Sequence, residues 1–152
     1  RAKREHLEDI LETLPWVATI DKFQHWVYEN PTHTPAQRTA AWNDIFDRFS
    51  DTVTNWQGLQ SAKDFLWQKQ LHLYEVPFYY IEYGMAQLGA IAVWRNYRRN
   101  KQQGLQNYLQ ALRLGNTRSI PAIYEAAGIR FDFSKNYIGE LMAFVKEELA
   151  KL

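Results

Sequence analysis

Apolar residues recur along this chain at steps of three and four, which is the period of the α-helix. The first run of this kind consists of Leu7, Ile10, Leu11, Leu14, Val17, Ile20 and Phe23. Pro15 lies within the run, where a proline is expected to kink the helix, and the helix is expected to end near Asn30 and Pro31. No stretch shows the alternation of a β-strand. The chain is therefore predicted to be all-α, a multi-helix array.

Capping residues mark where the next helices begin. Thr34 is suited to the N-cap position and Pro35 to the first helical position, so a second helix is predicted to run from there to about Phe49. Residues 61–64 (SAKD) have the shape of a capping box, with Asp in place of the usual Glu. This pattern predicts that a third helix opens at Ser61.

Residues 78–97 form a long apolar segment with small residues at Gly84, Ala86, Gly89, Ala90 and Ala92. Two glycines destabilise a helix unless another backbone approaches closely there. The segment is therefore predicted to be a central, buried helix, and Pro77 either starts it or kinks a helix that continues from earlier residues. The later boundaries are predicted at Gly115 after a helix over 105–114, at Ser119 and Gly128 around a short helix, and at Asp132 or Ser134 before a last helix toward Lys151.

The composition limits the function without identifying it. A chain of 152 residues is long enough to bury a core, so a single helical domain over residues 1–152 is predicted. The net charge of +1 gives no reason to expect a nucleic acid or an anionic membrane as partner. The absence of Cys excludes a thiol nucleophile and a thiolate zinc site, and it fits a cytoplasmic protein. No apolar stretch approaches the roughly 18 residues of a membrane span.

The histidines do not form a recognisable metal site. None lies in an HExxH arrangement, in which helical spacing would set two imidazoles on one face. The nearest approximations, Glu5 with His6 and His25 with Glu29, do not place two histidines one turn apart. No metal ligand is assigned, and solvated or capping roles are predicted for His6, His25, His33 and His72.

A histidine and several tyrosines lie close together in residues 72–83. Tyr80 and Tyr83 would share a face of a helix, and His72 could bend back toward them across the break at Pro77. A histidine and two phenols in one cavity could donate hydrogen bonds to an oxyanion or hold the carbonyls of a peptide. From spacing alone a packing role is favoured, because buried tyrosines are common in protein cores.

Basic and aromatic residues alternate over residues 94–101 (WRNYRRNK). Such a pattern can bind single-stranded nucleic acid. Here, however, the cations fall where the long helix is predicted to end, and cations at that position interact favourably with the helix dipole. A solvated C-terminal turn is therefore predicted, and no nucleic-acid partner.

Residues 71–99 (LHLYEVPFYYIEYGMAQLGAIAVWRNYRR) resemble the segment after the zinc site in oligoendopeptidase F-type enzymes, which belong to the wider thimet oligopeptidase family of zinc metallopeptidases. The Bacillus-type branch of that family is also similar over residues 11–21, 23–26, 119–121 and 124–129. These stretches follow one another in the same order and extend over essentially the whole chain. The extent of the likeness makes it more specific than any short motif in it.

The resemblance implies a mostly helical peptidase with a deep cleft, in which an HExxH helix and a later Glu hold the zinc that polarises the scissile carbonyl and activates a water. Those elements would precede Arg1, so the chain would be the C-terminal portion of the catalytic domain and inactive alone. In the family, a His and Tyr pair on a Tyr-rich helix binds the substrate and the oxyanion. The matching positions are His72, Tyr80 and Tyr83 as catalytic residues, with Tyr79 as a substrate-binding residue.

One departure affects this assignment. The mammalian-type pattern approaches the tyrosines through glycines, whereas this chain has Val76 and Pro77, so Tyr80 and Tyr83 correspond more directly than His72 does. The implied partners are short peptide substrates and the missing N-terminal part of the same enzyme. Helices that pack on that part should leave an apolar face exposed, so self-association is expected. The alternative is a stand-alone, non-catalytic helical binding module, and the residues preceding Arg1 would discriminate between the two.

Overall fold

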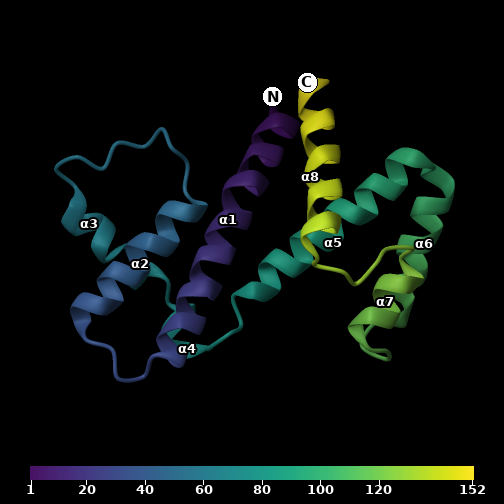
Figure 1. The fold of residues 1–152 in the computed structure, drawn as a ribbon. Helices are drawn as coiled ribbons and strands as arrows, with labels where there is room; N and C mark the ends of the chain where they lie inside the picture. The colour runs from purple at the N-terminus through teal and green to yellow at the C-terminus, as the bar shows by residue number, and fades with distance from the viewer. The chain divides into compact units, whose positions relative to one another are not determined.

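The computed structural model describes residues 1–152 and contains helices and no strand, which confirms the all-α prediction (Figure 1). No helix has the length and apolarity that crossing a membrane requires. The helices are α1 (Ala2–Glu29), α2 (Pro35–Phe49), α3 (Gln60–Asp64), the 3-10 helix η1 (Leu66–Lys69), α4 (His72–Glu75), α5 (Ile81–Arg99), α6 (Lys101–Leu114), α7 (Ile120–Ala126) and α8 (Lys135–Ala150).

The residues group into two compact units, one of Arg1–Glu8 with Met85–Leu152 and the other of Asp9–Gly84. In the first unit, the start of α1 lies beside the end of α8 (Figure 1), where Lys3 bonds to Glu148. In the second unit, α1 and α2 form a core that contains Ile20, Phe23, Trp42, Ile45 and Phe46. That residues 1–152 form a single domain, as part of a larger catalytic domain, stays a prediction.

Helices α1 and α2 follow the sequence signals closely. Helix α1 continues through Pro15, whose carbonyl accepts a hydrogen bond from the Thr19 hydroxyl at 2.8 Å. The predicted start of α2 is confirmed, because Thr34 Oγ1 accepts from the Gln37 N–H while Gln37 Oε1 accepts from the Thr34 N–H. This reciprocal pair satisfies two backbone donors that would otherwise lack partners.

The capping box predicted over residues 61–64 is wrong. The N-cap of α3 is Leu59, two residues before Ser61, and no side chain caps the helix. The Asp64 carboxylate does not accept from the Ser61 backbone N–H, as a capping box would require. It accepts hydrogen bonds from Asn43 and Gln60 instead, both at 2.7 Å. The carboxylate that the local pattern assigned to the cap is therefore bound in part by Asn43, a tertiary partner on α2.

The long apolar segment is shorter as a helix and less buried than predicted. Pro77 neither starts nor kinks it, since α5 begins four residues later at Ile81. Only one face is buried, and Ala86 and Ala90 are exposed. The glycines do admit close neighbours, but these are side chains rather than backbone. A Cβ on Gly84 would lie 3.1 Å from the Val17 side chain, and one on Gly89 would lie 2.6 Å from the Tyr124 hydroxyl.

The boundaries of the last three helices agree with the sequence in most places. Gly115 ends α6 with a positive φ, as predicted, although α6 begins at Lys101 and so is longer than the predicted 105–114. Of the two candidates for the last cap, Ser134 is the N-cap of α8, where its hydroxyl accepts from the Tyr137 N–H. Asp132 instead accepts from the Ser134 N–H.

The basic turn at the end of α5 is less solvated than predicted. The Arg95 side chain is buried and lies 3.4 Å from Glu140. Arg98 pairs at 3.1 Å with Glu148, which is itself buried. Two of the cations in this segment therefore serve the packing of α5 against α8.

Candidate functional site

The loop between α4 and α5 is strained and is held by one buried side chain. Phe78 has a φ of +61°, in the left-handed region that residues other than glycine rarely adopt. Its N–H donates to Gln24 Oε1 at 2.8 Å, and Gln24 Nε2 donates to the Leu73 carbonyl at 3.5 Å. The Phe78 ring packs against His25 and Tyr28, with centroids 4.9 and 4.8 Å away. Such strain persists only where neighbouring groups enforce it.

This loop brings the four residues predicted from the sequence together. The His72 ring lies 4.8 Å from the Tyr80 ring, 5.6 Å from Tyr83 and 6.4 Å from Tyr79, as measured between centroids. The rings of Tyr80 and Tyr83 lie 5.3 Å apart, although Tyr80 precedes α5 and only Tyr83 is on it. We call these four residues the tyrosine cluster. The contacts arise from the loop rather than from a shared helical face.

The cluster is partly open to solvent. Tyr79 and Tyr83 are 45% and 48% exposed, whereas His72 and Tyr80 are half-buried. Burial raises the pKa of the Tyr80 phenol above its ordinary value. The Tyr80 hydroxyl therefore keeps its proton at neutral pH. It can donate a hydrogen bond to a carbonyl oxygen or an oxyanion.

A chain of polar contacts lies behind His72. Trp16 Nε1 donates to Gln70 Oε1 at 3.0 Å, and Gln70 Nε2 lies 2.7 Å from His72 Nδ1. On the other side of the imidazole ring, Nε2 lies 3.4 Å from the Tyr83 hydroxyl. The sequence patterns identified His72 and Tyr83 but not Gln70 or Gln24, since nothing in local spacing distinguishes these glutamines from the others in the chain.

The donor set does not fit a zinc ion. No group of three or more His, Cys, Asp or Glu side chains in this chain lies close enough together to hold a metal. His25 pairs with Asp21 at 3.6 Å, and His33 bonds to the Asn30 carbonyl.

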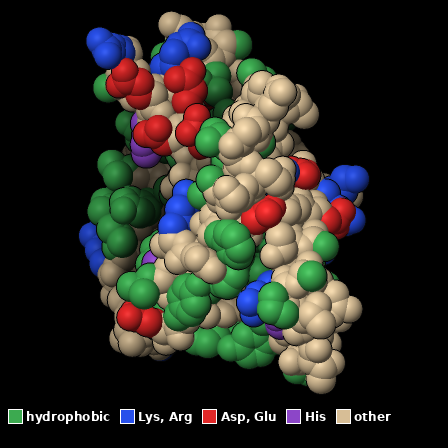
Figure 2. Space-filling model, turned by 90° about the vertical axis from the view of Figure 1, so that its left-hand side faces the viewer, with side chains coloured by type: hydrophobic (Ala, Val, Ile, Leu, Met, Phe, Trp, Pro, Cys, Tyr) green, Lys and Arg blue, Asp and Glu red, His purple; other side chains and the backbone are tan.

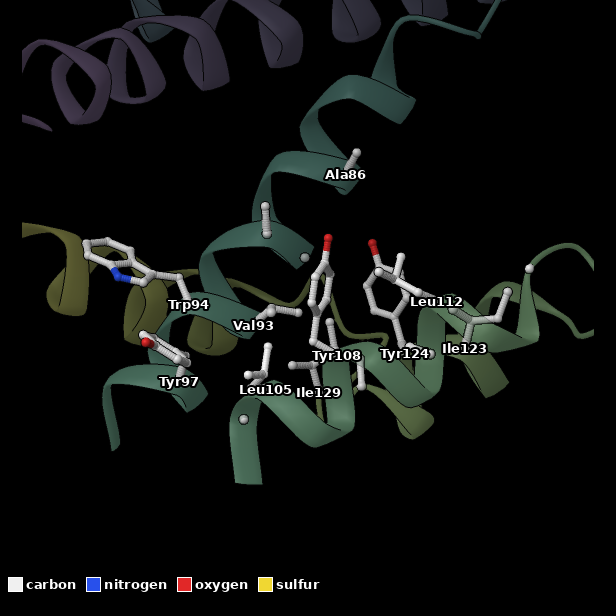
Figure 3. A pocket seen from close by; sticks show the side chains of 16 residues that line it. Ala86, Val93, Trp94, Tyr97, Leu105, Tyr108, Leu112, Ile123, Tyr124 and Ile129 are labelled. Carbon is white, nitrogen blue, oxygen red and sulfur yellow. The ribbon is translucent and has the colours of Figure 1, made fainter. Parts of the chain in front are cut away.

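A hollow lies in the unit formed by Arg1–Glu8 and Met85–Leu152. We call it the apolar groove; it has a volume of about 640 Å³ and no charged side chain lines it. Figure 3 shows it between α5, α6 and α7, with the hydroxyls of Tyr108 and Tyr124 on the same side. The Tyr124 hydroxyl donates to the Met85 carbonyl at 3.1 Å. The labelled lining residues are Ala86, Val93, Trp94, Tyr97, Leu105, Tyr108, Leu112, Ile123, Tyr124 and Ile129.

Large apolar side chains also reach the surface outside the groove. Figure 2 shows hydrophobic side chains at the surface among acidic and basic ones. In the unit Asp9–Gly84, the exposed apolar residues include Val53, Leu59, Phe65, Leu71 and Tyr74. Val53 lines a hollow that also has the charged side chains of Glu12, Asp51 and Lys69 in its wall, whereas no charged side chain lines the groove.

Comparison with known proteins identifies the family. The sequence model of peptidase family M3 matches residues 1–143. Two solved structures, an oligoendopeptidase F at 29% identity and a PZ peptidase A with an inhibitor at 31% identity, each match with a TM-score of 0.83. Each match covers 99% of this chain but 27% of the other chain, so this chain spans about a quarter of their length.

No curated protein matches the chain significantly. The family match and the two structures nevertheless confirm the resemblance to oligoendopeptidase F-type enzymes that the sequence indicated. Because the family match extends over most of the residues, the chain belongs to peptidase family M3.

Proposed function

We propose that this chain is the C-terminal part of a zinc-dependent oligoendopeptidase and that the tyrosine cluster binds the peptide substrate and stabilises the oxyanion. The observation that favours this most is the contact of one imidazole with three phenols at a partly open surface, in a chain of a peptidase family. Zinc and the HExxH motif belong, in this proposal, to the part of the enzyme that precedes Arg1.

The chemistry proposed for this chain uses only hydrogen-bond donors. Tyr80 and Tyr83 donate to the oxygen of the scissile carbonyl as negative charge develops on it, which stabilises the transition state more than the ground state. His72 supports this by its contact with Tyr83 at 3.4 Å. Tyr79, which is 45% exposed, binds the substrate peptide beside them. The contact between His72 and Tyr83 is present before the substrate arrives.

The substrates proposed are short peptides, and the isolated chain is proposed to be inactive because it holds neither the Lewis acid nor the general base of this chemistry. The parent enzyme is proposed to act in the cytoplasm, which fits a chain without cysteine. Its principal partner is the N-terminal part of the same enzyme. No nucleic acid and no membrane is proposed as a partner.

The proposed function is tested by Tyr80→Phe in the full-length enzyme. Removing one oxyanion donor typically lowers kcat by about 10²–10³, so we expect a fall of that size in kcat and a much smaller rise in KM. An unchanged kcat would reduce Tyr80 to a packing residue. The isolated 152-residue chain should release no product from the same peptide.

We also propose that the isolated chain self-associates through the apolar groove. Three side chains of α6 at the groove, Leu105, Tyr108 and Leu112, are 49%, 42% and 57% exposed. An open hollow lined without charge is the kind of surface that a partner usually covers. In the absence of the rest of the enzyme, a second copy is the occupant proposed for it.

A further inference from the structure

The orientation of the Gln70 side chain is determined by its neighbour Trp16. An indole N–H can only donate a hydrogen bond, so the Gln70 atom 3.0 Å from Trp16 Nε1 must be the carbonyl oxygen. The amide nitrogen of Gln70 then points the other way, to within 2.7 Å of His72 Nδ1. The reversed amide would set two N–H donors against each other at Trp16.

This orientation determines where His72 holds its proton. The Gln70 amide nitrogen is a donor, so His72 Nδ1 must accept and is unprotonated. A neutral imidazole with an unprotonated Nδ1 has its hydrogen on Nε2, which faces the Tyr83 hydroxyl at 3.4 Å. The Tyr83 oxygen can then accept from His72, which leaves its own hydrogen free to donate outward. Protonation of Nδ1 would place its hydrogen against the Gln70 amide.

The Gln70 side chain is attached to a well-supported backbone. Its N–H donates to the Trp67 carbonyl at 3.0 Å, and its carbonyl accepts from the Leu73 N–H at 3.1 Å. On the far side, the Trp16 ring makes an edge contact with Trp42 at 6.0 Å between centroids. Because Trp42 is fully buried in the core, the series Trp16–Gln70–His72 is anchored at its inner end.

We propose that Gln70 is a positioning residue that keeps His72 in the Nε2–H tautomer and so turns the Tyr83 hydroxyl into a donor for the substrate. The catalytic consequence rests on the function proposed above, whereas the tautomer does not. Gln70 touches no reacting atom in this proposal and acts only through His72.

The tautomer is measured in the 152-residue chain by two-dimensional NMR of the imidazole nitrogens, with His72 assigned by its loss in His72→Asn. In the unsubstituted chain at neutral pH, Nδ1 should show the shift of an unprotonated nitrogen and Nε2 that of an N–H. Gln70→Glu replaces the donor with an acceptor, so the proton should move to Nδ1. Gln70→Leu should leave a mixture of the two forms.

The matched control is Gln68→Leu, which changes an exposed glutamine of η1 whose side chain makes no hydrogen bond in the structure, and it should leave the His72 signals unchanged. Exposed histidines also prefer Nε2–H, so Gln70→Glu is the decisive variant. The proposal is overturned if Nδ1 holds the proton in the unsubstituted chain, or if folded Gln70→Glu leaves it on Nε2. Should neither Gln70 variant fold, Trp16→Phe, which frees the Gln70 amide to turn, must show the mixture, and an unchanged spectrum overturns the proposal.

The consequence for activity is measured in the full-length enzyme. Gln70→Leu should lower kcat by about 10–100-fold, by analogy with the range for outer partners of metal-bound histidines, with little change in KM. If Tyr80→Phe leaves kcat unchanged while Gln70→Glu still moves the proton, the proposed function fails and the tautomer assignment stands. If Tyr80→Phe lowers kcat while Gln70→Leu has no effect on it, the positioning role of Gln70 is overturned and the proposed function stands.

Discussion

The tyrosine cluster and the apolar groove are both built from aromatic residues, yet they differ in how their side chains are held. In the cluster, His72 is linked by hydrogen bonds to Gln70 and through it to Trp16, beside a loop with a strained Phe78. In the groove, the hydrogen bond from Tyr124 to a backbone carbonyl is a polar contact in a lining without charge. Directional hydrogen bonds therefore hold the tyrosine cluster, whereas apolar packing shapes the groove.

This difference indicates different uses. Hydrogen bonds set both the position and the direction of a donor, which is what stabilisation of a developing charge requires. Apolar contact depends on area and not on direction, so it suits association with another surface. The two regions can therefore be separated by substitutions that affect one and leave the other unchanged.

The largest effect, on kcat, is expected from a comparison of two tyrosines of similar exposure, Tyr83 in the tyrosine cluster and Tyr108 in the apolar groove. In the full-length enzyme, Tyr83→Phe should lower kcat by about 10²–10³, equivalent to about 2.7–4 kcal/mol, because an oxyanion donor is lost. Tyr108→Phe, which removes the hydroxyl of a groove residue of similar exposure, should leave kcat within twofold. Steady-state kinetics on one short peptide measures both. Equal effects of the two substitutions on kcat would contradict a catalytic role that is specific to the tyrosine cluster.

The next effect concerns the stability of the unit that contains the groove. The buried Glu148 carboxylate contacts Lys151 at 2.7 Å, Arg98 at 3.1 Å and Lys3 at 3.4 Å. The hydrogen bond from Lys151 is the largest cause that lowers the pKa of Glu148 from its ordinary value of 4.5 to about 2. Glu148→Gln should reduce the free energy of unfolding at neutral pH by about 1.5–3 kcal/mol, since a charge-assisted hydrogen bond is lost.

The pH dependence has a definite sign. The folded pKa lies below the unfolded one, so this stabilisation is complete above about pH 4.5 and is lost as the pH falls toward about 2. Urea unfolding across that range should therefore show a smaller pH dependence for Glu148→Gln than for the unsubstituted chain. Equal slopes would mean that Glu148 does not link the start of α1 to α8.

A smaller loss of stability is expected in the unit Asp9–Gly84 from Gln24→Leu. The leucine side chain occupies a similar space without polar atoms. The Phe78 N–H would lose its acceptor, and a part-buried donor left without a partner costs about 1–2 kcal/mol. Urea unfolding should show this loss, whereas Gln68→Leu should leave the stability within about 0.5 kcal/mol. If Gln24→Leu is neutral, the strained loop is held by the packing of Phe78 and not by the glutamine.

The smallest effect is expected on self-association. Leu112→Glu places a charge at the groove and should weaken association of the isolated chain by about tenfold, or about 1.4 kcal/mol. Leu59→Glu is the matched control, because Leu59 lies in the other unit and the two leucines are 55% and 57% exposed. Sedimentation velocity over a range of concentrations compares them. A chain that is monomeric at all concentrations would contradict the proposed use of the groove.

The local signals that succeeded are those whose partners lie within one turn of helix. Thr34 and Gln37 are three residues apart, so their reciprocal cap can be read directly from the chain. The pattern at residues 61–64 has the same spacing but failed, because the Asp64 carboxylate accepts from Asn43, 21 residues away, and from the Gln60 side chain. A local motif thus predicts a cap only where no other side chain competes for the same group.

The sequence by itself determined the all-α class, the family, and the residues His72, Tyr79, Tyr80 and Tyr83 as the candidate site. It could do so because the helical period, the caps and the family likeness are all recognisable from neighbouring residues in the sequence. Only the tertiary structure decided what holds that site. Trp16 and Gln70 are 54 residues apart, as are Gln24 and Phe78. Hydrogen bonds over such distances depend on how the helices pack, and no local spacing encodes them.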